Sequence, residues 1–333
     1  MSTPIGVGII GCGVIGQKRA KALTGARLVA CADKDLGRAE QLARGTEGCI
    51  ASSNWRQVVG TANVSAVVIA TPHDALAEIT AAAVTAGKHV LVEKPGARHV
   101  SEFQPLLPLA QKMGVRIRVG FNHRYHRAFR QARAIVDSGA LGPLMFLRAR
   151  YGHGGRIGYE KEWRAQPEVS GGGELIDQGV HLIDLARWFL GDFNAVDGHA
   201  HTYFWNMPVD DNAFLLLKTE RGQVAFLHAS CTEWKNTFSF ELYGRSGKVQ
   251  IDGLGGSYGT ERLAWYKMPP EMGPPETTIW KYPMADDSWE IEMAEFLEDI
   301  RLGRQPAVGL ADAVAAMNIV DKIYRKSGYD HRP

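Results

Sequence analysis

The chain lacks the features that would place it in a membrane or on a nucleic acid. No apolar stretch approaches the roughly 20 residues of a membrane-spanning helix. The formal net charge is only +2, and no basic run or stripe accompanies it, so neither a nucleic acid nor an anionic membrane surface is indicated. No basic segment and apolar core precede the first strand-like run, so we expect no secretory signal. The predicted partner is a small molecule.

Cysteine is also scarce, and its spacing predicts no metal site. The short paired spacings that build zinc centres are absent. The two adjacent acids Asp210 and Asp211 lack the further ligands that a cation site needs. We therefore expect reduced thiols in a cytoplasmic protein without a bound metal. The chain has four cysteines: Cys12, Cys31, Cys49 and Cys231.

Length and composition indicate an ordinary globular protein with two domains. The chain has 333 residues, of which 45% are hydrophobic and 22% charged. This length supports two separate cores. No internal repeat or low-complexity tract interrupts it.

One stretch, residues 171–184, combines three glycines with an acid and a base. Apolar residues recur there at helical spacing, so Asp177 and His181, four residues apart, are predicted to share one helix face. Glycines before a helix let an oxygen-rich ligand approach its N-terminus. The alternative is structural: Asp177 caps or salt-bridges the helix, and His181 is a satisfied, half-buried side chain.

The first forty residues contain a dinucleotide-binding pattern. An apolar run at 5–10 is followed by a G-x-G-x-x-G sequence and then a helical stretch, the order that the fingerprint requires. Its first glycine would make a tight turn, its second would admit a pyrophosphate, and its third would allow close helix packing. The residues are Gly11, Cys12, Gly13, Val14, Ile15 and Gly16.

A second predicted strand, 27–32, ends at Asp33, where an acid would bind the adenosine ribose hydroxyls. A carboxylate at this point repels a 2′-phosphate, so NAD is favoured. Lys34 and Arg38 follow and would hold that phosphate instead, which leaves NADP as the alternative. Asp33 as a simple turn or cap residue is the structural alternative.

Two further strands end in polar residues at the expected cofactor edge of a parallel sheet. The run 64–70 is followed by Thr71, Pro72 and His73, and the run 89–92 by Glu93 and Lys94. A lysine there would polarise a substrate oxygen. Taken alone, Lys94 fits a surface lysine equally well.

With these motifs in order, the chain resembles the glucose-fructose oxidoreductase, inositol dehydrogenase and rhizopine-catabolism (Gfo/Idh/MocA) family over nearly its whole length. The resemblance depends on the glycine fingerprint, on A-G-K-H-V-L-V-E-K-P at 86–95, on G-G-G-E-L-I-D-Q-G-V-H at 171–181, and on a tail with E-F-L-E-D-I-R at 295–301. A closing helix is expected at 311–327.

The resemblance implies an α/β protein in two parts. Residues 1–121 would form an NAD(P)-binding Rossmann domain with a doubly wound parallel sheet. Residues 122–333 would form a substrate-binding and oligomerisation domain with an open, largely antiparallel sheet, and the C-terminal helix would return to the Rossmann domain. Five β-rich runs agree with this: 144–150, 195–204, 213–218, 223–230 and 238–243, with a hairpin at 243–249. The uncovered sheet face favours a homodimer or homotetramer.

The resemblance also implies a catalytic set, Lys94, Asp177 and His181, and a Lys94–Pro95 bond that is often cis. His181 would accept the hydroxyl proton as hydride leaves for the nicotinamide, because imidazole titrates near neutral pH. Lys94 would stabilise the developing alkoxide. Asp177 would either bind a neighbouring hydroxyl or orient the imidazole.

Two segments depart from the family's usual pattern. A histidine common in the loop after residue 71 is Leu76 here, and His73 stands where asparagine is frequent. The usual Asn-Arg-Arg-Phe-Asp-Pro run is N-H-R-Y-H-R at 122–127. Because of both changes, the substrate contacts of a family member do not carry over directly to these positions.

Candidate substrate contacts lie in glycine-rich and aromatic loops. Aromatic faces pack on sugar C–H groups, and arginine supplies paired donors. The same loops fit a solvated surface as the alternative. The substrate-binding candidates, in addition to the catalytic set, are Asn122, His126, Arg156, Trp163 and Arg164.

The sequence thus predicts a cytoplasmic NAD(P)-dependent oxidoreductase that acts on a secondary alcohol or ketone of a sugar, cyclitol or sugar derivative. Two alternatives stay open. One is an NAD-retaining glycoside hydrolase that oxidises its substrate transiently, and the other is a non-catalytic NAD(P)-sensing regulator. Retention of both the lysine and the acid/base pair argues against the sensor.

Overall fold

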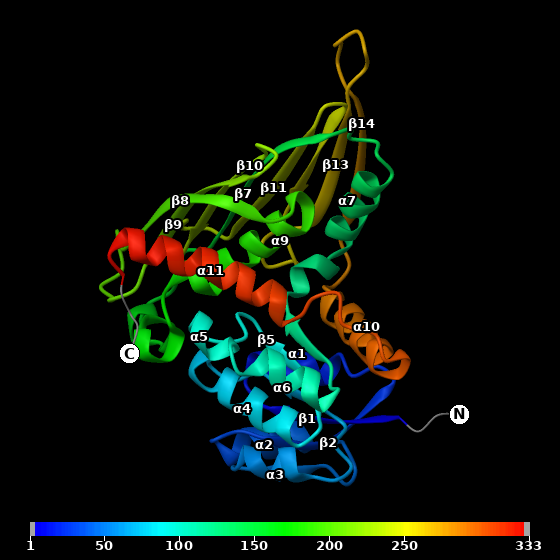
Figure 1. The fold of residues 1–333 in the computed structure, drawn as a ribbon, viewed down its shortest axis with the longest axis vertical. Coiled ribbons are helices and arrows are strands. Elements are labelled where there is room, and N and C mark those ends of the chain that lie inside the picture. Colours follow the sequence, from blue (N-terminus) through cyan, green and yellow to red (C-terminus); the bar gives the residue numbers. More distant parts are fainter. Residues whose placement is uncertain (1–3, 330–333) are drawn as a thin grey trace. The chain divides into compact units, whose positions relative to one another are not determined.

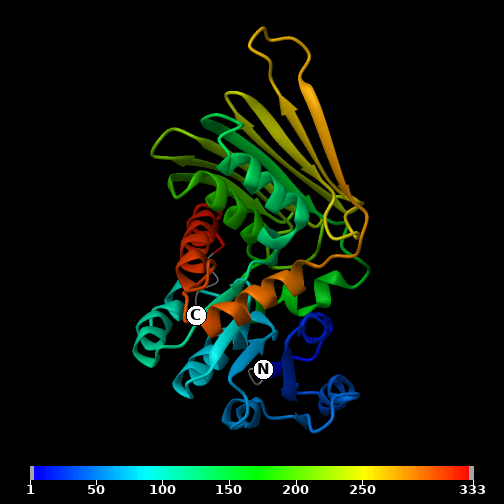
Figure 2. The ribbon, with the colours of Figure 1, turned by 90° about the vertical axis from the view of Figure 1, so that its right-hand side faces the viewer.

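A computed structural model describes residues 4–329 and divides into two compact units. The first unit contains the chain through Asn122 together with Trp289–Val314, and the second contains His123–Ser288 and the chain from Ala315. Figures 1 and 2 show the ribbon of both. Among the described residues, no helix is long and apolar enough to cross a membrane.

The first unit contains a six-stranded, fully parallel sheet with the order β3-β2-β1-β4-β5-β6. The order in which successive strands are added reverses between β1 and β4, and in a doubly wound sheet this switch point creates the crevice where ligands bind. Its strands are β1 (Ile5–Ile10), β2 (Ala26–Ala32), β3 (Ile50–Ser52), β4 (Ala66–Ile69), β5 (His89–Glu93) and β6 (Ile117–Gly120).

Helices follow these strands, as the alternating apolar pattern predicts. They are α1 (Val14–Lys21), α2 (Leu36–Ala43), α3 (Trp55–Gly60), α4 (His73–Thr85), α5 (Val100–Phe103) and α6 (Leu106–Met113). A late segment of the chain, α10 (Ser288–Leu302), adds to the same unit from Trp289 onward.

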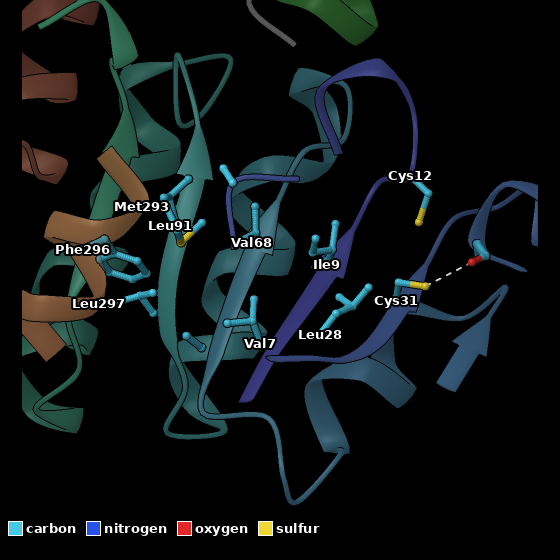
Figure 3. Close-up of a cluster of buried hydrophobic side chains, with 13 residues drawn as sticks. Val7, Ile9, Cys12, Leu28, Cys31, Val68, Leu91, Met293, Phe296 and Leu297 are labelled. Carbon is cyan, nitrogen blue, oxygen red and sulfur yellow. Dashed lines mark hydrogen bonds between the residues drawn. The ribbon is translucent and has the colours of Figure 1, made fainter. Parts of the chain in front are cut away.

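The core of the first unit shows why its strands read as nearly continuous apolar runs. Val68 and Leu91 are fully buried in the centre of the sheet, because helices cover both faces of a parallel sheet. From α10, Met293 and Phe296 pack into the same cluster (Figure 3). The distant segment 289–302 is therefore part of this core.

The second unit contains an eight-stranded sheet with the order β14-β13-β12-β11-β7-β10-β9-β8. Every neighbouring pair is antiparallel except β7 with β10, so the expected fold class is confirmed in both units. The strands are β7 (Leu144–Gly152), β8 (Phe193–His201), β9 (Asn212–Thr219), β10 (Val224–Ser230), β11 (Thr237–Gly244), β12 (Gly247–Asp252), β13 (Glu261–Lys267) and β14 (Glu276–Tyr282).

One face of this sheet is covered and the other is open. Figures 1 and 2 show α7 (Arg127–Asp137) and α9 (Val180–Leu190) against one face. Leu215 and Leu227 point to that side and are buried, whereas their neighbours Leu216 and Phe226 are 52% and 47% exposed. This alternation is the period of two that strand geometry imposes on side chains.

Several boundaries differ from the sequence-based expectations. The proline-rich stretch 268–283, for which no strand was predicted, contains β14, which pairs along β13. The strand expected to reach Phe204 ends at His201, because the Asp211 carboxylate binds the backbone N–H groups of residues 203–205. The closing helix α11 (Leu310–Ser327) begins one residue earlier than expected.

Candidate functional site

The glycine-rich loop of the first unit has the geometry of a dinucleotide cradle. Gly11 has φ +92°, and a Cβ there would lie 2.4 Å from the Ala70 carbonyl oxygen. A Cβ on Gly16 would lie 1.9 Å from the Gly11 carbonyl oxygen, so close helix packing needs this glycine. A Cβ on Gly13 would instead meet no atom within 4 Å. Space therefore remains beside the N-terminus of α1, where N–H groups suit a pyrophosphate.

Asp33 lies against this loop at the end of β2. Its Oδ2 accepts a hydrogen bond of 2.8 Å from the Cys12 backbone N–H, and its Oδ1 accepts one from the Asp35 N–H. The carboxylate therefore lies at the point where the fingerprint requires an acid. Arg38 lies 3.4 Å from the Asp35 carboxylate, and both side chains are exposed. Lys34 is exposed as well.

The loop after β4 adds polar groups to the same crevice. Thr71 Oγ1 is buried and has no hydrogen-bond partner among the described residues, which fits a cofactor group as its missing partner. Pro72 is the N-cap of α4, and His73 is its first residue and is buried. The open space, the acid at Asp33 and this buried hydroxyl all fit the NAD that the fingerprint predicts. Val14, 73% exposed, and Ile15 complete the loop.

Lys94 follows β5 in a turn that a buried ion-pair network holds. The Glu93 carboxylate lies 2.6 Å from the Arg19 guanidinium, which also lies 2.5 Å from Glu292. All three side chains are buried, and breaking such a pair would leave a buried charge unpaired. The network joins the residue before Lys94 to α1. The Lys94–Pro95 peptide bond is cis, as expected.

The acid/base segment of the second unit is not a regular α-helix. Residues Leu175–Gly179 form a π-helical turn, which continues directly into α9. Single π turns inside helices occur frequently at functional sites. Asp177 and His181 lie on this continuous helical segment and are 8% and 5% exposed. The sequence predicted the helix but not its widened turn.

A buried carboxylate, Asp210, fixes the start of that segment. Its Oδ1 accepts the Gly173 N–H at 2.9 Å, its Oδ2 accepts the Leu175 N–H at 2.8 Å, and its carbonyl accepts the Glu174 N–H at 2.9 Å. Three N–H groups that a helix start leaves without partners are thus satisfied by one residue. A Cβ on Gly173 would lie 1.9 Å from the Asp210 carbonyl oxygen, so only glycine permits this approach.

The Asp210 carboxylate also accepts a hydrogen bond of 2.7 Å from the Tyr324 hydroxyl of α11. Burial raises the pKa of Asp210 to about 6, because desolvation outweighs the hydrogen bonds that favour the charged form. The neighbouring Asp211 binds three backbone N–H groups of the aromatic loop 203–205. The adjacent acids are therefore structural groups of the helix start and the loop.

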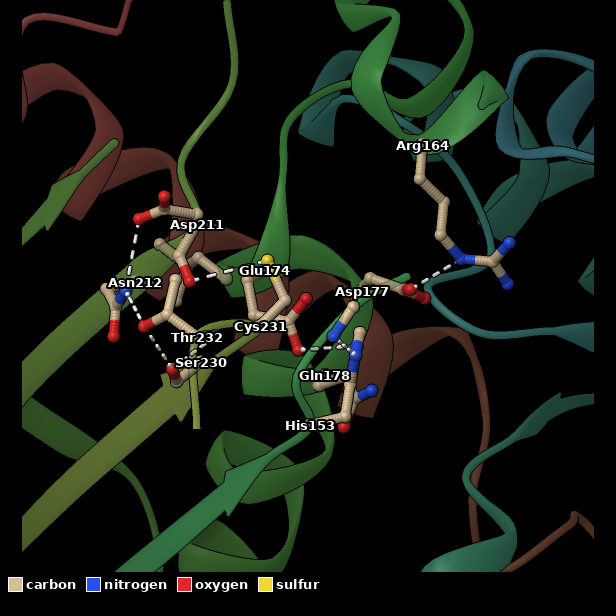
Figure 4. A network of polar contacts seen from close by, with 12 residues as sticks. His153, Arg164, Glu174, Asp177, Gln178, Asp211, Asn212, Ser230, Cys231 and Thr232 are labelled. Atoms are coloured by element: carbon tan, nitrogen blue, oxygen red, sulfur yellow. Dashed lines mark hydrogen bonds and ion pairs between the residues drawn. The ribbon is translucent and has the colours of Figure 1, made fainter. Parts of the chain in front are cut away.

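Arg164 is brought directly to Asp177, as Figure 4 shows. Its Nε donates a hydrogen bond of 2.8 Å to Asp177 Oδ2, and the Asp177 charge raises the pKa of the Arg164 guanidinium. The Arg164 guanidinium also lies 4.5 Å from the centre of the Trp163 ring. Two candidate substrate contacts thus lie beside the acid of the pair.

The remaining substrate candidates have other partners. Arg156 pairs with Glu162 at 2.7 Å. The His126 Nδ1 lies 2.8 Å from Glu261 in a buried pair at the start of α7. Asn122 is buried at the end of the first unit.

Two further histidines near the acid/base segment are not among the site residues predicted from the sequence, although His153 lies in the glycine-rich loop expected to contact a polyol. His153 Nε2 faces the Glu174 carboxylate at 3.7 Å, and burial lowers the pKa of His153. His123 stacks on His181 with ring centres 3.8 Å apart. The only available signal for His123 was its place in the polar run next to Asn122.

Replacing Gly13 by Ala is expected to weaken NAD binding without destabilising the fold. The added methyl group meets no protein atom, but it fills space that the pyrophosphate needs. We expect the dissociation constant for NAD, measured by calorimetric titration, to rise roughly tenfold or more, about 1.4 kcal/mol. Gly273→Ala, also in open space, is the matched control. Unchanged NAD affinity would contradict the assignment.

Replacing Asp210 by Asn should change how stability depends on pH. Because the folded pKa lies above the ordinary 3.8, the Asp210 contribution is complete below that value and is lost as pH rises through about 6. The advantage of wild type over Asp210→Asn in free energy of unfolding should shrink by about 2 kcal/mol between pH 4 and 7. Urea titrations at several pH values measure it, with Asp74→Asn, an exposed acid, as control. A gap that is constant with pH would contradict the raised pKa.

Comparison with known families matches both halves of the chain. Residues 5–121 match the model of an oxidoreductase family with an NAD-binding Rossmann fold, and residues 129–250 match the GFO/IDH/MocA C-terminal domain. Inositol 2-dehydrogenase 3 of Saccharopolyspora erythraea is 34% identical and covers 94% of this chain and 90% of its own length. Levoglucosan dehydrogenase of Pseudarthrobacter phenanthrenivorans is 27% identical, with 74% and 73% covered.

Solved structures show the same fold. A levoglucosan dehydrogenase in complex with NADH and levoglucosan superposes with a TM-score of 0.86 at 24% identity, covering 98% of each chain. An NAD-binding oxidoreductase from Klebsiella pneumoniae gives 0.85 at 23% identity, covering 99% of this chain and 98% of that one. With the two family matches and the full-length relative, the chain belongs to the Gfo/Idh/MocA family of NAD-binding oxidoreductases.

Proposed function

We propose that the protein is an NAD-dependent dehydrogenase that oxidises a secondary hydroxyl of a sugar or cyclitol, or reduces the matching ketone. The observation that carries the proposal is the buried acid/base segment, in which Asp177 and His181 share one helical segment and Arg164 binds Asp177. Relatives named for inositol and levoglucosan support the substrate class.

NAD, when bound, supplies the nicotinamide that accepts hydride. His181 accepts the hydroxyl proton, because imidazole exchanges protons near neutral pH in either direction. Asp177 binds a neighbouring hydroxyl of the substrate or orients the imidazole. The hydrogen bond from Arg164 fixes the plane of the carboxylate, which favours a defined substrate orientation.

Lys94 stabilises the oxygen that becomes an alkoxide as its proton leaves. An ammonium group placed at developing negative charge acts most strongly where water is excluded. The half-buried Lys94 and the buried Arg19–Glu93 pair next to it fit such a fixed cation. For the polyol itself we propose contacts from Asn122, His126, Arg156, Trp163 and Arg164.

We propose NAD rather than NADP as the preferred cofactor. The Asp33 carboxylate at the glycine loop would repel a 2′-phosphate. Arg38, a candidate for binding that phosphate, already lies near the Asp35 carboxylate. The remaining cofactor contacts that we propose are Lys34, Thr71, Pro72, His73, Glu93 and Lys94.

We also propose a cytoplasmic location. The four cysteines are free, and three of them are buried. A contact with Cys12, together with burial, raises the pKa of Cys31 to about 12, so its reactive thiolate is scarce at neutral pH. Buried reduced thiols fit a reducing compartment.

The function is tested by measuring the absorbance of reduced nicotinamide. The purified protein is mixed with NAD or NADP and with each member of a panel of sugars, inositols, sugar phosphates and nucleotide sugars. Net reduction would identify both cofactor and substrate class. No net signal, with cofactor already bound to the purified protein, would contradict the dehydrogenase and favour internal redox catalysis, with aryl glycosides as the next panel. Ligand binding without turnover over the whole panel would favour a sensor.

Lys94→Ala should lower kcat by roughly 100-fold or more, because the developing alkoxide loses its cation. The dissociation constant for NAD should stay within about threefold, because Lys94 is only one of many proposed cofactor contacts and its main proposed role concerns the chemical step. Lys112→Ala, on the exposed face of α6, is the matched control and should behave as wild type. A large loss of NAD binding with normal turnover at saturation would contradict the role.

We propose a homo-oligomer formed through the open sheet face. One cross-strand row on that face contains Leu216, Phe226, Arg148, Glu241 and Ile279 on successive or nearby strands. Its apolar members are about half exposed, and an exposed patch of this kind favours burial against a partner. In a symmetric dimer the same row of apolar and paired charged side chains on a second copy of the chain would pack against it.

Phe226→Lys should convert the oligomer to a monomer, because burying an unpaired ammonium at the contact costs more than exposing the ring. Light scattering after gel filtration measures the mass. Met113→Lys, a comparably exposed residue of the first unit, should leave the mass unchanged. Wild-type protein that is monomeric at micromolar concentration would refute the interface.

A further inference from the structure

The His181 ring lies flat on a second buried imidazole. The ring centres of His123 and His181 are 3.8 Å apart and their planes differ by 18°. Both side chains are nearly inaccessible, at 6% and 5% exposed. His123 lies in a short 3-10 turn, Asn122–Tyr125, whereas His181 is on α9. The contact therefore joins two segments that are far apart in the chain.

The sheet holds His123 from its other sides. Tyr151 of β7 packs against the His123 ring with centres 5.3 Å apart, and Phe238 of β11 does so at 6.3 Å. The His126 ring meets His123 edge-on at 5.5 Å. His123 is thus fixed within an aromatic cluster, and its flat face is the surface on which His181 rests.

A neighbouring ion pair sets the register between the turn and the helix. Arg124, directly after His123, donates to both oxygens of Asp184, with distances of 2.8 and 2.6 Å. Asp184 lies three residues after His181 on α9, and both members of the pair are buried. Paired donors of this kind are geometrically demanding. The turn is therefore attached to α9 by two adjacent contacts of different chemistry.

An imidazole has little intrinsic preference for one ring plane. Torsion about the last side-chain bond of histidine is broad and roughly two-fold, so packing decides where its nitrogens point. Parallel stacking at 3.8 Å is lost when the His181 ring rotates out of plane. Proton transfer, in contrast, needs the acceptor nitrogen in line with the hydroxyl.

We infer that His123 is a positioning residue, which fixes the ring plane of His181 by stacking so that the imidazole accepts the substrate proton in one orientation. The inference rests on the proposed role of His181 as acid/base. His123 itself exchanges no proton with the substrate. What its side chain contributes is a flat, buried ring, and any planar ring of similar size should serve.

The experiment compares His123→Leu, which fills space without a flat ring, with His123→Phe, which keeps one. With the substrate found by the absorbance panel, His123→Leu should lower kcat roughly tenfold or more and raise the solvent deuterium isotope effect, since proton transfer becomes slower. KM and NAD affinity should stay within about twofold. His123→Phe should restore most of kcat. His199→Leu, at an exposed histidine of the same unit, is the matched control.

A second readout does not depend on turnover. In proton NMR spectra, the ring protons of His181, assigned by their loss in His181→Gln, should be shifted upfield by the stacked ring. His123→Leu should abolish that shift, and His123→Phe should keep it. Thermal midpoints verify that each variant is folded.

The outcomes separate this inference from the proposed function. An active enzyme in which folded His123→Leu keeps wild-type kcat, or in which His123→Phe fails to restore it, overturns the positioning role. An upfield shift that survives in His123→Leu overturns it as well. Full activity of His181→Gln would instead overturn the proposed function, while the shift would still report whether the rings stack.

Discussion

The acid/base segment depends on one buried carboxylate. Asp210 binds three consecutive backbone N–H groups at the start of that segment and receives the Tyr324 hydroxyl. Without these bonds, the glycine-led start would leave polar groups unsatisfied away from water. The positions of the residues that follow in the helix, Asp177 and His181 among them, therefore depend on these hydrogen bonds. The glycines are required because side chains would collide with Asp210 and Tyr324.

The first unit depends on a different kind of buried contact. There the fixed element is a buried set of ion pairs, in which Arg19 of α1 binds both Glu93 and Glu292. Such a set adds little net stability relative to apolar packing, but it is intolerant of losing one member. The residue before Lys94 and the helix after the glycine loop are consequently held by the same guanidinium. The helix after the glycine loop and Lys94 are thus both positioned through Arg19.

The sequence predicted those parts of the molecule that local patterns encode. Glycine spacing, apolar strands and the acid at Asp33 each have a physical reason that operates within a few residues, and the fold that they indicate is confirmed. The π turn was not predictable, because its hydrophobic spacing is that of an ordinary helix. Contacts such as Asp210 with Gly173, Arg124 with Asp184, or His123 with His181 join distant segments. No periodicity within either segment reveals such a contact.

The candidate catalytic residues show the same difference between what local sequence patterns predict and what the structure adds. Motif resemblance pointed to Lys94, Asp177 and His181, and they remain proposals. The structure added what surrounds two of them: Arg164 at the Asp177 carboxylate and a flat imidazole beneath His181. Arg164 was already a substrate-binding candidate from the sequence, whereas His123 stood only in a polar run next to Asn122.

The late return of the chain to its first unit has a consequence for biosynthesis. Met293, Phe296 and Leu297 of α10 complete the core around Leu91, and Glu292 pairs with the buried Arg19. A ribosome that has released only the first 122 residues has therefore exposed an unfinished core and a guanidinium that lacks one of its carboxylates. At about 5–20 residues per second, the missing helix arrives on the order of ten seconds or more later. During that interval the nascent nucleotide-binding half presents apolar surface that chaperones recognise, so its maturation is tied to completion of the whole polypeptide.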